Sequence, residues 1–226
     1  MDFDRMLGYA AALAQNNRRE WFHEHHGEYA EARGDFVQLL ELMRFSLADA
    51  SPELGSSIMH MNVKDWMYRT ARDARIYKNA PPYNPAWRAY IAADRRSWGP
   101  IGYFLSIFPG ESLFGTGVGF RETEAVNRVR IFIAEHFEEF DAIRRENRLT
   151  IEGDALKRTP CGYDDSHPAA EWIRHKSWLI VEHIPDRKLT DFTASCRLAA
   201  KTVKRMEPMR LFLLRAVGME PGREEE

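Results

Sequence analysis

The 226-residue chain is long enough for one large domain or two small ones, and its 44% hydrophobic and 29% charged residues suit a globular protein with a buried core. Its 32 Lys and Arg against 34 Asp and Glu give a net charge of −2, which argues against a dedicated nucleic-acid binder, because such domains carry a basic excess. No segment reaches the roughly 18 consecutive apolar residues of a membrane helix. Charged residues interrupt any signal-like run at the N-terminus, and Cys161 and Cys196 form no paired motif. We therefore expect a soluble cytoplasmic protein with two free thiols and no membrane partner.

The first fifth of the chain is predicted to be helical. Apolar spacing indicates one helix over 3–14 and a second over 22–48, in which two glycines favour a bend. Asn17 is a candidate N-cap for the second helix, with Glu20 three residues on as the returning partner of a capping box.

The next segments alternate between apolar runs and turn residues. We predict a loop over 51–55, a strand over 58–63 and a short helix within 85–98. The pattern then predicts strands over 103–108 and 112–118, joined into a hairpin by a Pro-Gly turn.

Three glycines, Gly115, Gly117 and Gly119, share one face of the last of these strands. Such a face usually marks close approach by another backbone or by a ligand. A long helix over 122–145 and a short strand over 149–152 are expected to follow.

The C-terminal part is predicted to hold a short helix over 169–175, a strand over 178–181 and a last long helix capped by Thr190. Pro208 is expected to start a final helical piece. Together these elements predict a single α+β domain over residues 1–218, with a central antiparallel sheet flanked by helices. The acidic tail, 219–226, is expected to be disordered.

The segment 66–84 is the most unusual stretch of the chain. It carries four cations, each three residues after the last, with one acid, Asp73, among them and a proline pair that favours a strand passing into a loop. The cations are Arg69, Arg72, Arg75 and Lys78. Four like charges on one segment repel each other, so buried acids or a bound anion must compensate them.

Two interpretations of these cations remain open. In the first, they cradle a phosphate or carboxylate, while Asp73 orients one guanidinium and Tyr83 donates its hydroxyl. In the second, Asp65 and Asp73 hold the arginines in a structural ion-pair network. Because a buried pair tolerates the loss of one partner poorly, we predict that Asp73 is substantially buried and bonded to an arginine.

Other chemistry is not supported by the residue patterns. The cluster His23, His25 and His26 lacks the spacing that brings zinc ligands onto one helical face, so no metal is predicted. Neither a nucleophile elbow nor a phosphate-binding glycine–lysine loop is present, and no cofactor is predicted. Whether the protein is an enzyme stays open.

Several segments follow the pattern of a known family in order along nearly the whole chain. Asn16-Asn-Arg-Arg-Glu-Trp-Phe22 matches an Asn-Asn-x-x-x-Trp-Phe element. Arg72-Asp-Ala-Arg-Ile-Tyr-Lys78 and Pro82-Tyr83 match an Arg-Asp-x-Arg-Phe-x-Lys-Asp-Lys-x-Pro-Tyr-Lys signature. The hairpin and its glycine strand match too, as do Leu156-Lys-Arg-Thr-Pro160, Gly162-Tyr163 and His167-Pro168. The chain thus resembles a widespread conserved family of unknown function, which implies one α+β domain but no reaction.

The chain departs from the family pattern at three charged positions. Asn79 and Ala80 stand where the signature has Asp-Lys, and Asn84 stands where it ends in Lys. If those charges carry the family's activity, the resemblance implies that this member has lost or altered it.

The sequence therefore predicts a cytoplasmic domain that binds a small anionic ligand through the cations of 66–84, Asp73 and Tyr83. The alternative is a non-catalytic structural or protein-interaction module whose partner the sequence does not identify. A nucleic-acid-processing protein ranks last because of the net charge.

Overall fold

The computed structural model describes residues 2–92, 101–120, 122–189 and 191–218, and within them the chain is a single α+β domain. A four-stranded antiparallel sheet in the order β1-β2-β3-β4 forms its centre. The strands are β1 (Trp87–Ile91), β2 (Tyr103–Ile107), β3 (Ser112–Gly119) and β4 (Ser177–Ile184). This confirms the predicted fold class and the predicted hairpin, in which Tyr103 pairs with Thr116.

The strands separate their side chains onto two faces. In β1, Trp87, Ala89 and Ile91 are buried, whereas Arg88 and Tyr90 alternate with them on the other face and are half-buried. The register pairs Arg88 with Ser106 and carries the same division into β2. One face of the sheet is thus a packed core, and the other holds Arg88.

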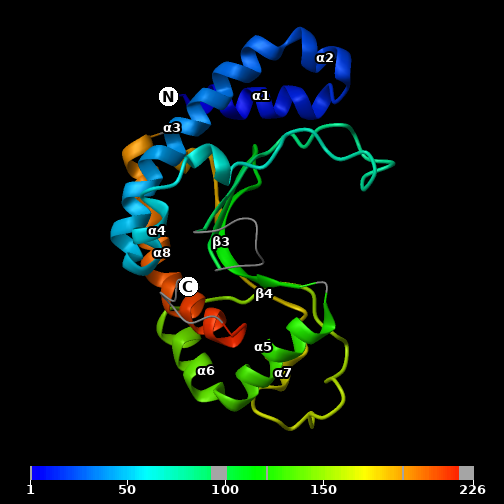
Figure 1. The fold of residues 1–226 in the computed structure, drawn as a ribbon, viewed down its shortest axis with the longest axis vertical. Helices are drawn as coiled ribbons and strands as arrows, with labels where there is room; N and C mark the ends of the chain where they lie inside the picture. The colour runs from blue at the N-terminus through cyan, green and yellow to red at the C-terminus, as the bar shows by residue number, and fades with distance from the viewer. Residues whose placement is uncertain (1, 93–100, 121, 190, 219–226) are drawn as a thin grey trace.

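Long helices cover the core face (Figure 1). They are α1 (Phe3–Gln15), α3 (His26–Ala50) and α8 (Phe192–Ala216), with α2 (Arg19–Glu24) connecting the first two. Asp2 and Asp191 cap α1 and α8 by accepting hydrogen bonds from backbone N–H groups in the first turn. Thr190, the predicted cap of α8, lies outside the described residues.

Two predictions about helix ends are wrong. Pro208 lies inside α8 rather than at a helix start, because Met206, Met209 and Phe212 are fully buried on both sides of it. Packing on that scale offsets the roughly 3 kcal/mol that a proline costs in a helix interior. The predicted bend in the second helix falls at His25, between α2 and α3, and not at the glycines.

The stretch after α3 also differs from the prediction. Residues of the expected 51–55 loop and 58–63 strand form α4 (Pro52–Ile58) and the short 3-10 helix η1 (Val63–Trp66). Proline is well suited to the first helical turn, and Leu54 and Ile58, four residues apart, both reach the core. The expected helix within 85–98 is β1 instead, and its residues 93–98 lie outside the described ranges.

The end of the molecule opposite α1 and α2 is built from α5 (Thr123–Glu135), α6 (Phe137–Glu146) and α7 (Ala170–Ile173) (Figure 1). The single helix expected over 122–145 is divided at His136, which leaves helical geometry. Phe140 packs against Phe212 of α8 and joins this end to the core. The expected strand over 149–152 is a single bridge between Glu152 and Leu179.

The glycine face of β3 confirms the expectation of close approach. A Cβ atom on Gly115 would lie 2.3 Å from the carbonyl oxygen of Ile180, and one on Gly117 would lie 2.1 Å from that of Trp178. The neighbour is therefore the backbone of β4, with the ring of Phe104 also against Gly115. Across the described parts of the chain, no helix is long and apolar enough to cross a membrane.

Candidate anion-binding site

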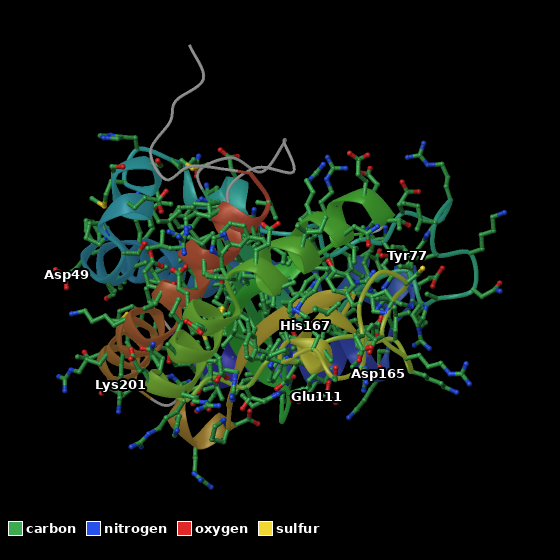
Figure 2. All side chains as sticks on the ribbon, turned by 90° about the horizontal axis from the view of Figure 1, so that it is seen from below. Asp49, Tyr77, Glu111, Asp165, His167 and Lys201 are labelled. Atoms are coloured by element: carbon green, nitrogen blue, oxygen red, sulfur yellow. The ribbon has the colours of Figure 1, made fainter. Side chains whose placement is uncertain are left out.

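Residues 66–84, called the basic loop below, leave the body of the molecule and fold back on themselves. The two limbs are held by hydrogen bonds from Arg72 N to Pro82 O (2.8 Å) and from Asn84 N to Thr70 O (2.8 Å). The predicted strand is reduced to isolated bridges, one of them between Ala71 and Tyr83. Figure 2 shows Tyr77 on this projecting loop, on the side of the molecule opposite Asp49 and Lys201.

The base of the basic loop is tied to the N-terminal helices. The Asn17 side chain accepts a hydrogen bond from Tyr83 N (3.0 Å) and donates one to Tyr83 O (2.9 Å). The ring of Phe22 stacks on that of Tyr83 at 4.2 Å, and the hydroxyls of Tyr29 and Thr70 share a hydrogen bond. Asn17 is therefore not the predicted helix cap. It joins two segments that carry the family resemblance.

Tyr83 and Asp73 differ in their surroundings from what the sequence predicts. Tyr83 is only 7% exposed, so its ring supports the loop. The Asp73 carboxylate bonds the Arg75 guanidinium, with Oδ2 2.6 Å from Nη2, as predicted. However, the Asp73 side chain is 37% exposed and that of Arg75 is 89% exposed, so the predicted burial is wrong. The hydrogen bonds from Arg75 hold the pKa of Asp73 below its usual range.

The reason for the error lies in the local geometry. No helix forms here to align the cations, and the turn lets Asp73 bond both the backbone N–H of Arg75, at 2.9 Å, and its side chain. A pair made within one exposed turn needs no burial and is screened by water.

We expect Asn17→Ala to destabilise the protein more than Asp73→Ala does. Asn17 makes two hydrogen bonds to a backbone segment far away in sequence, and their loss should lower the free energy of unfolding by about 1–3 kcal/mol. Asp73→Ala should leave the melting temperature nearly unchanged, because its ion pair is solvated. Chemical denaturation of both variants checks the order, and a larger effect at Asp73 would contradict it.

Arg88 is the residue of this region that the sequence interpretation missed. It lies on β1, and its Nε is buried and has no hydrogen-bond partner among the described residues. The guanidinium lies 5.1 Å from the centre of the Tyr68 ring, and no described carboxylate forms an ion pair with it. Burial lowers the pKa of Arg88, and the positive charge of Arg72 lowers it further. Strand alternation places Arg88 on the face opposite the buried Trp87 and Ala89, but this pattern is visible only when 87–91 is predicted to be a strand.

The structure brings together only part of the predicted set. Arg72 is half-buried, donates from Nη1 to Pro81 O (2.9 Å) and acts electrostatically on Arg88. Arg69 and Lys78 are exposed, and no described interaction links them to Arg88. The arrangement therefore has two guanidinium groups, Arg72 and Arg88, that act on each other electrostatically, with the ring of Tyr68 against Arg88 and no described acid acting on Arg88.

A structural ion-pair network does exist, but at α8. Arg210 is fully buried and donates from Nε to Glu207 (2.8 Å), from Nη1 to Ile101 O (2.7 Å) and from Nη2 to Glu53. Glu207 also accepts the hydroxyl of Tyr103 at 2.6 Å. Two carboxylates compensate this arginine, and its pKa is raised, so it needs no anion.

Other classes of site have little support among the described residues. A cavity of about 20 Å³ lies between α3, α8 and the sheet, is lined mostly by apolar side chains and holds about one water molecule at most. The ranges that the structure describes contain no group of three or more His, Cys, Asp or Glu side chains able to hold a metal ion.

The family model for the conserved hypothetical protein DUF2461 matches residues 5–212. The match includes the Asn17 element, the basic loop, β1 and the loop before α7. No curated protein and no solved structure matches the chain.

Proposed function

The chain belongs to the DUF2461 family, and we propose that it binds a small anionic ligand between the guanidinium groups of Arg72 and Arg88. The observation that carries this proposal is the buried Nε of Arg88, which has no hydrogen-bond partner in the described parts of the chain. The guanidinium also lies close enough to Arg72 for the two charges to repel. The family description names no ligand.

The electrostatics of the pair favour an anion. A buried donor without a partner costs roughly 1–3 kcal/mol, and two nearby cations add repulsion. A phosphate or carboxylate oxygen at this position would accept the free Nε–H and place negative charge between both guanidinium groups. Binding of an anion would thus offset the free-energy cost of the unpaired donor and of the repulsion.

The chemistry of the neighbours favours binding over a reaction. Arginine presents a planar set of donors suited to phosphate and carboxylate oxygens. Tyr68 and Tyr77 are 43% and 52% exposed and offer ring surface beside the cations. The nearest acid in the basic loop, Asp73, is engaged with Arg75 and its lowered pKa makes it a weak base.

A protein-interaction module remains the second candidate because of one observation. Ile76, in the middle of the basic loop, is 68% exposed, and the exposed Tyr77 follows it. The two adjacent side chains together expose apolar surface on a projecting loop, which a partner protein could cover. A partner protein bound there would be released by Ile76→Asp, whereas an anion held by Arg88 would not.

Titration calorimetry with pyrophosphate, inorganic phosphate and citrate tests the anion site. We expect Arg72→Gln and Arg88→Gln each to weaken binding of the preferred anion about 10- to 100-fold, because a charge-assisted hydrogen bond contributes ~1.5–3 kcal/mol. Arg75→Gln is the matched control, since this arginine lies in the same region but is exposed and already paired. Equal losses in all three variants would contradict a specific site.

The stability of an Arg88 variant separates a binding role from a structural one. In the absence of anion, Arg88→Met should raise the free energy of unfolding by roughly 1 kcal/mol, because it removes a partly buried charge without a counter-ion. The same variant should lose the stabilisation that pyrophosphate gives to the wild type. A clear loss of stability in Arg88→Met without anion would show that Arg88 serves the fold instead.

A further inference from the structure

Arg130 is a second arginine whose charge the fold does not compensate. It lies on α5, far from the basic loop in Figure 1, and is only 6% exposed. The other buried charged residues of the described ranges are Asp35, which pairs with Arg5, and Arg210, which pairs with two glutamates. No described carboxylate pairs with Arg130.

The hydrogen bonds of Arg130 leave two donors unused. Nε and Nη2 both donate to the carbonyl oxygen of His175, at 3.2 and 3.0 Å, and Nη1 donates to the side-chain oxygen of Asn127 at 3.1 Å. A guanidinium has five N–H groups. One N–H on each terminal nitrogen is therefore without a described acceptor, and these are the nitrogens that a bidentate oxyanion engages.

Among the described residues, no acid acts electrostatically on Arg130. In the loop 155–168, Asp165 bonds Thr159 and Arg174, and Asp164 accepts the backbone N–H of Ser166. Glu135 is exposed at the end of α5 and forms no described ion pair with Arg130. Figure 2 shows Asp165 and His167 on this loop.

Tyr163 lies close enough to Arg130 for each to act on the other's charge. It is half-buried against the core, and burial raises its pKa while the charge of Arg130 opposes that rise. Its hydroxyl is therefore protonated at neutral pH and has a proton to donate. Tyr163 also belongs to the Gly-Tyr element of the sequence, which the basic loop does not use.

We propose that Arg130 and Tyr163 form a second oxyanion site, which takes a single phosphate or carboxylate group. The two unused N–H groups of Arg130 bind two oxygens of the anion, and the hydroxyl of Tyr163 donates to it. The site lies at the end of the molecule formed by α5 to α7 and does not depend on the site at Arg72 and Arg88.

The test is a count of anion sites by titration calorimetry with inorganic phosphate, repeated with acetate to separate phosphate from carboxylate. The wild type should bind two phosphate ions. Arg88→Gln and Arg130→Gln should each keep one site at the wild-type affinity and weaken the other about 10- to 100-fold, and the double variant should be weakened at both. Tyr163→Phe should weaken the second site about 3- to 10-fold. Arg128→Gln, two residues away on α5 and 53% exposed, is the matched control and should keep both sites.

The two proposals fail separately in this experiment. If Arg88→Gln weakens no site but Arg130→Gln weakens one, only the function proposed for the basic loop is wrong. If Arg130→Gln retains every phosphate site of the wild type at the wild-type affinity, the second site is wrong. Should Arg130→Gln not fold, Tyr163→Phe decides the question, because unchanged phosphate affinities in that variant overturn the proposal.

Discussion

Arg210→Met is expected to lower the free energy of unfolding by about 3–5 kcal/mol, a loss large enough to unfold a marginally stable domain. The guanidinium is fully buried and joins Glu53 of α4, Glu207 of α8 and the carbonyl of Ile101. Its removal leaves two carboxylates inside the protein without their cation. Burial would then raise the pKa of Glu207, which the hydrogen bonds from Arg210 now lower against the effect of burial.

Urea denaturation of Arg210→Met and of Arg215→Met measures this effect on one helix. Arg215 pairs with Glu139, but both side chains are more than 40% exposed, so its loss should cost only about 0–1 kcal/mol. Glu207→Gln keeps the shape of the side chain while removing its charge and should also be strongly destabilising. An Arg210→Met protein within 1 kcal/mol of the wild type would contradict the role of the network.

Gly117→Ala should be the second severe variant, with an expected loss of about 3–5 kcal/mol. Gly117 has φ of +142°, a conformation that residues with a Cβ atom rarely adopt. The new Cβ would also lie 2.1 Å from Trp178 O and 2.8 Å from the Cα of Leu179. The strands β3 and β4 would have to separate locally, so overpacking adds to the backbone strain.

Gly34→Ala is the matched control for the same chemical change. Gly34 lies inside α3, and a Cβ there meets no atom within 4 Å. Alanine favours a helix by about 0.5–1 kcal/mol over glycine, so this variant should be more stable than the wild type. Thermal melts of the two variants should therefore shift in opposite directions, and a Gly117→Ala protein as stable as the wild type would show that the strands can adjust.

The sequence predicts those elements whose signals are local. The hairpin of β2 and β3 follows from its Pro-Gly turn, and α1 follows from an uninterrupted apolar face. Residues 87–91 form a strand and not the expected helix. The sequence does not separate the two, because Trp87 and Ile91 fit both a helical spacing of four and the alternation of a strand. The hydrogen bonds to β2 decide for the strand, and they form between segments that local sequence patterns do not relate.

In the candidate site, too, the sequence predicts the contacts between residues close in sequence and not those between distant segments. The pattern located Arg72 and the pair of Asp73 with Arg75, since these lie within a few residues of one another. It does not predict Arg88, the hydrogen bonds from Asn17 to the backbone of Tyr83, or the Arg210 network, because each depends on contacts between distant segments. Glu53 and Arg210, for example, are separated by 157 positions.

The three departures from the family signature form no described interaction with Arg88. Asn79 and Ala80 are exposed at the outer part of the basic loop. Asn84 has a local role, because its side chain accepts the backbone N–H of Ala86 at 3.1 Å. None of the three residues forms a described hydrogen bond with Arg88 or acts on its charge, so the proposal for Arg72 and Arg88 does not require the missing charges.

The most direct test of the anion site is the side-chain ¹⁵N–¹H spectrum of the arginines during a titration with pyrophosphate, with the Arg88 signal assigned by its absence in Arg88→Lys. The buried Nε–H of Arg88 has no hydrogen-bond partner among the residues that the structure describes, so its signal reports directly on an acceptor that binds there. We predict a saturable downfield shift of the Arg88 signal and of Arg72, while Arg75 stays unchanged. An Arg88 signal that does not move at saturating pyrophosphate would contradict the proposed function.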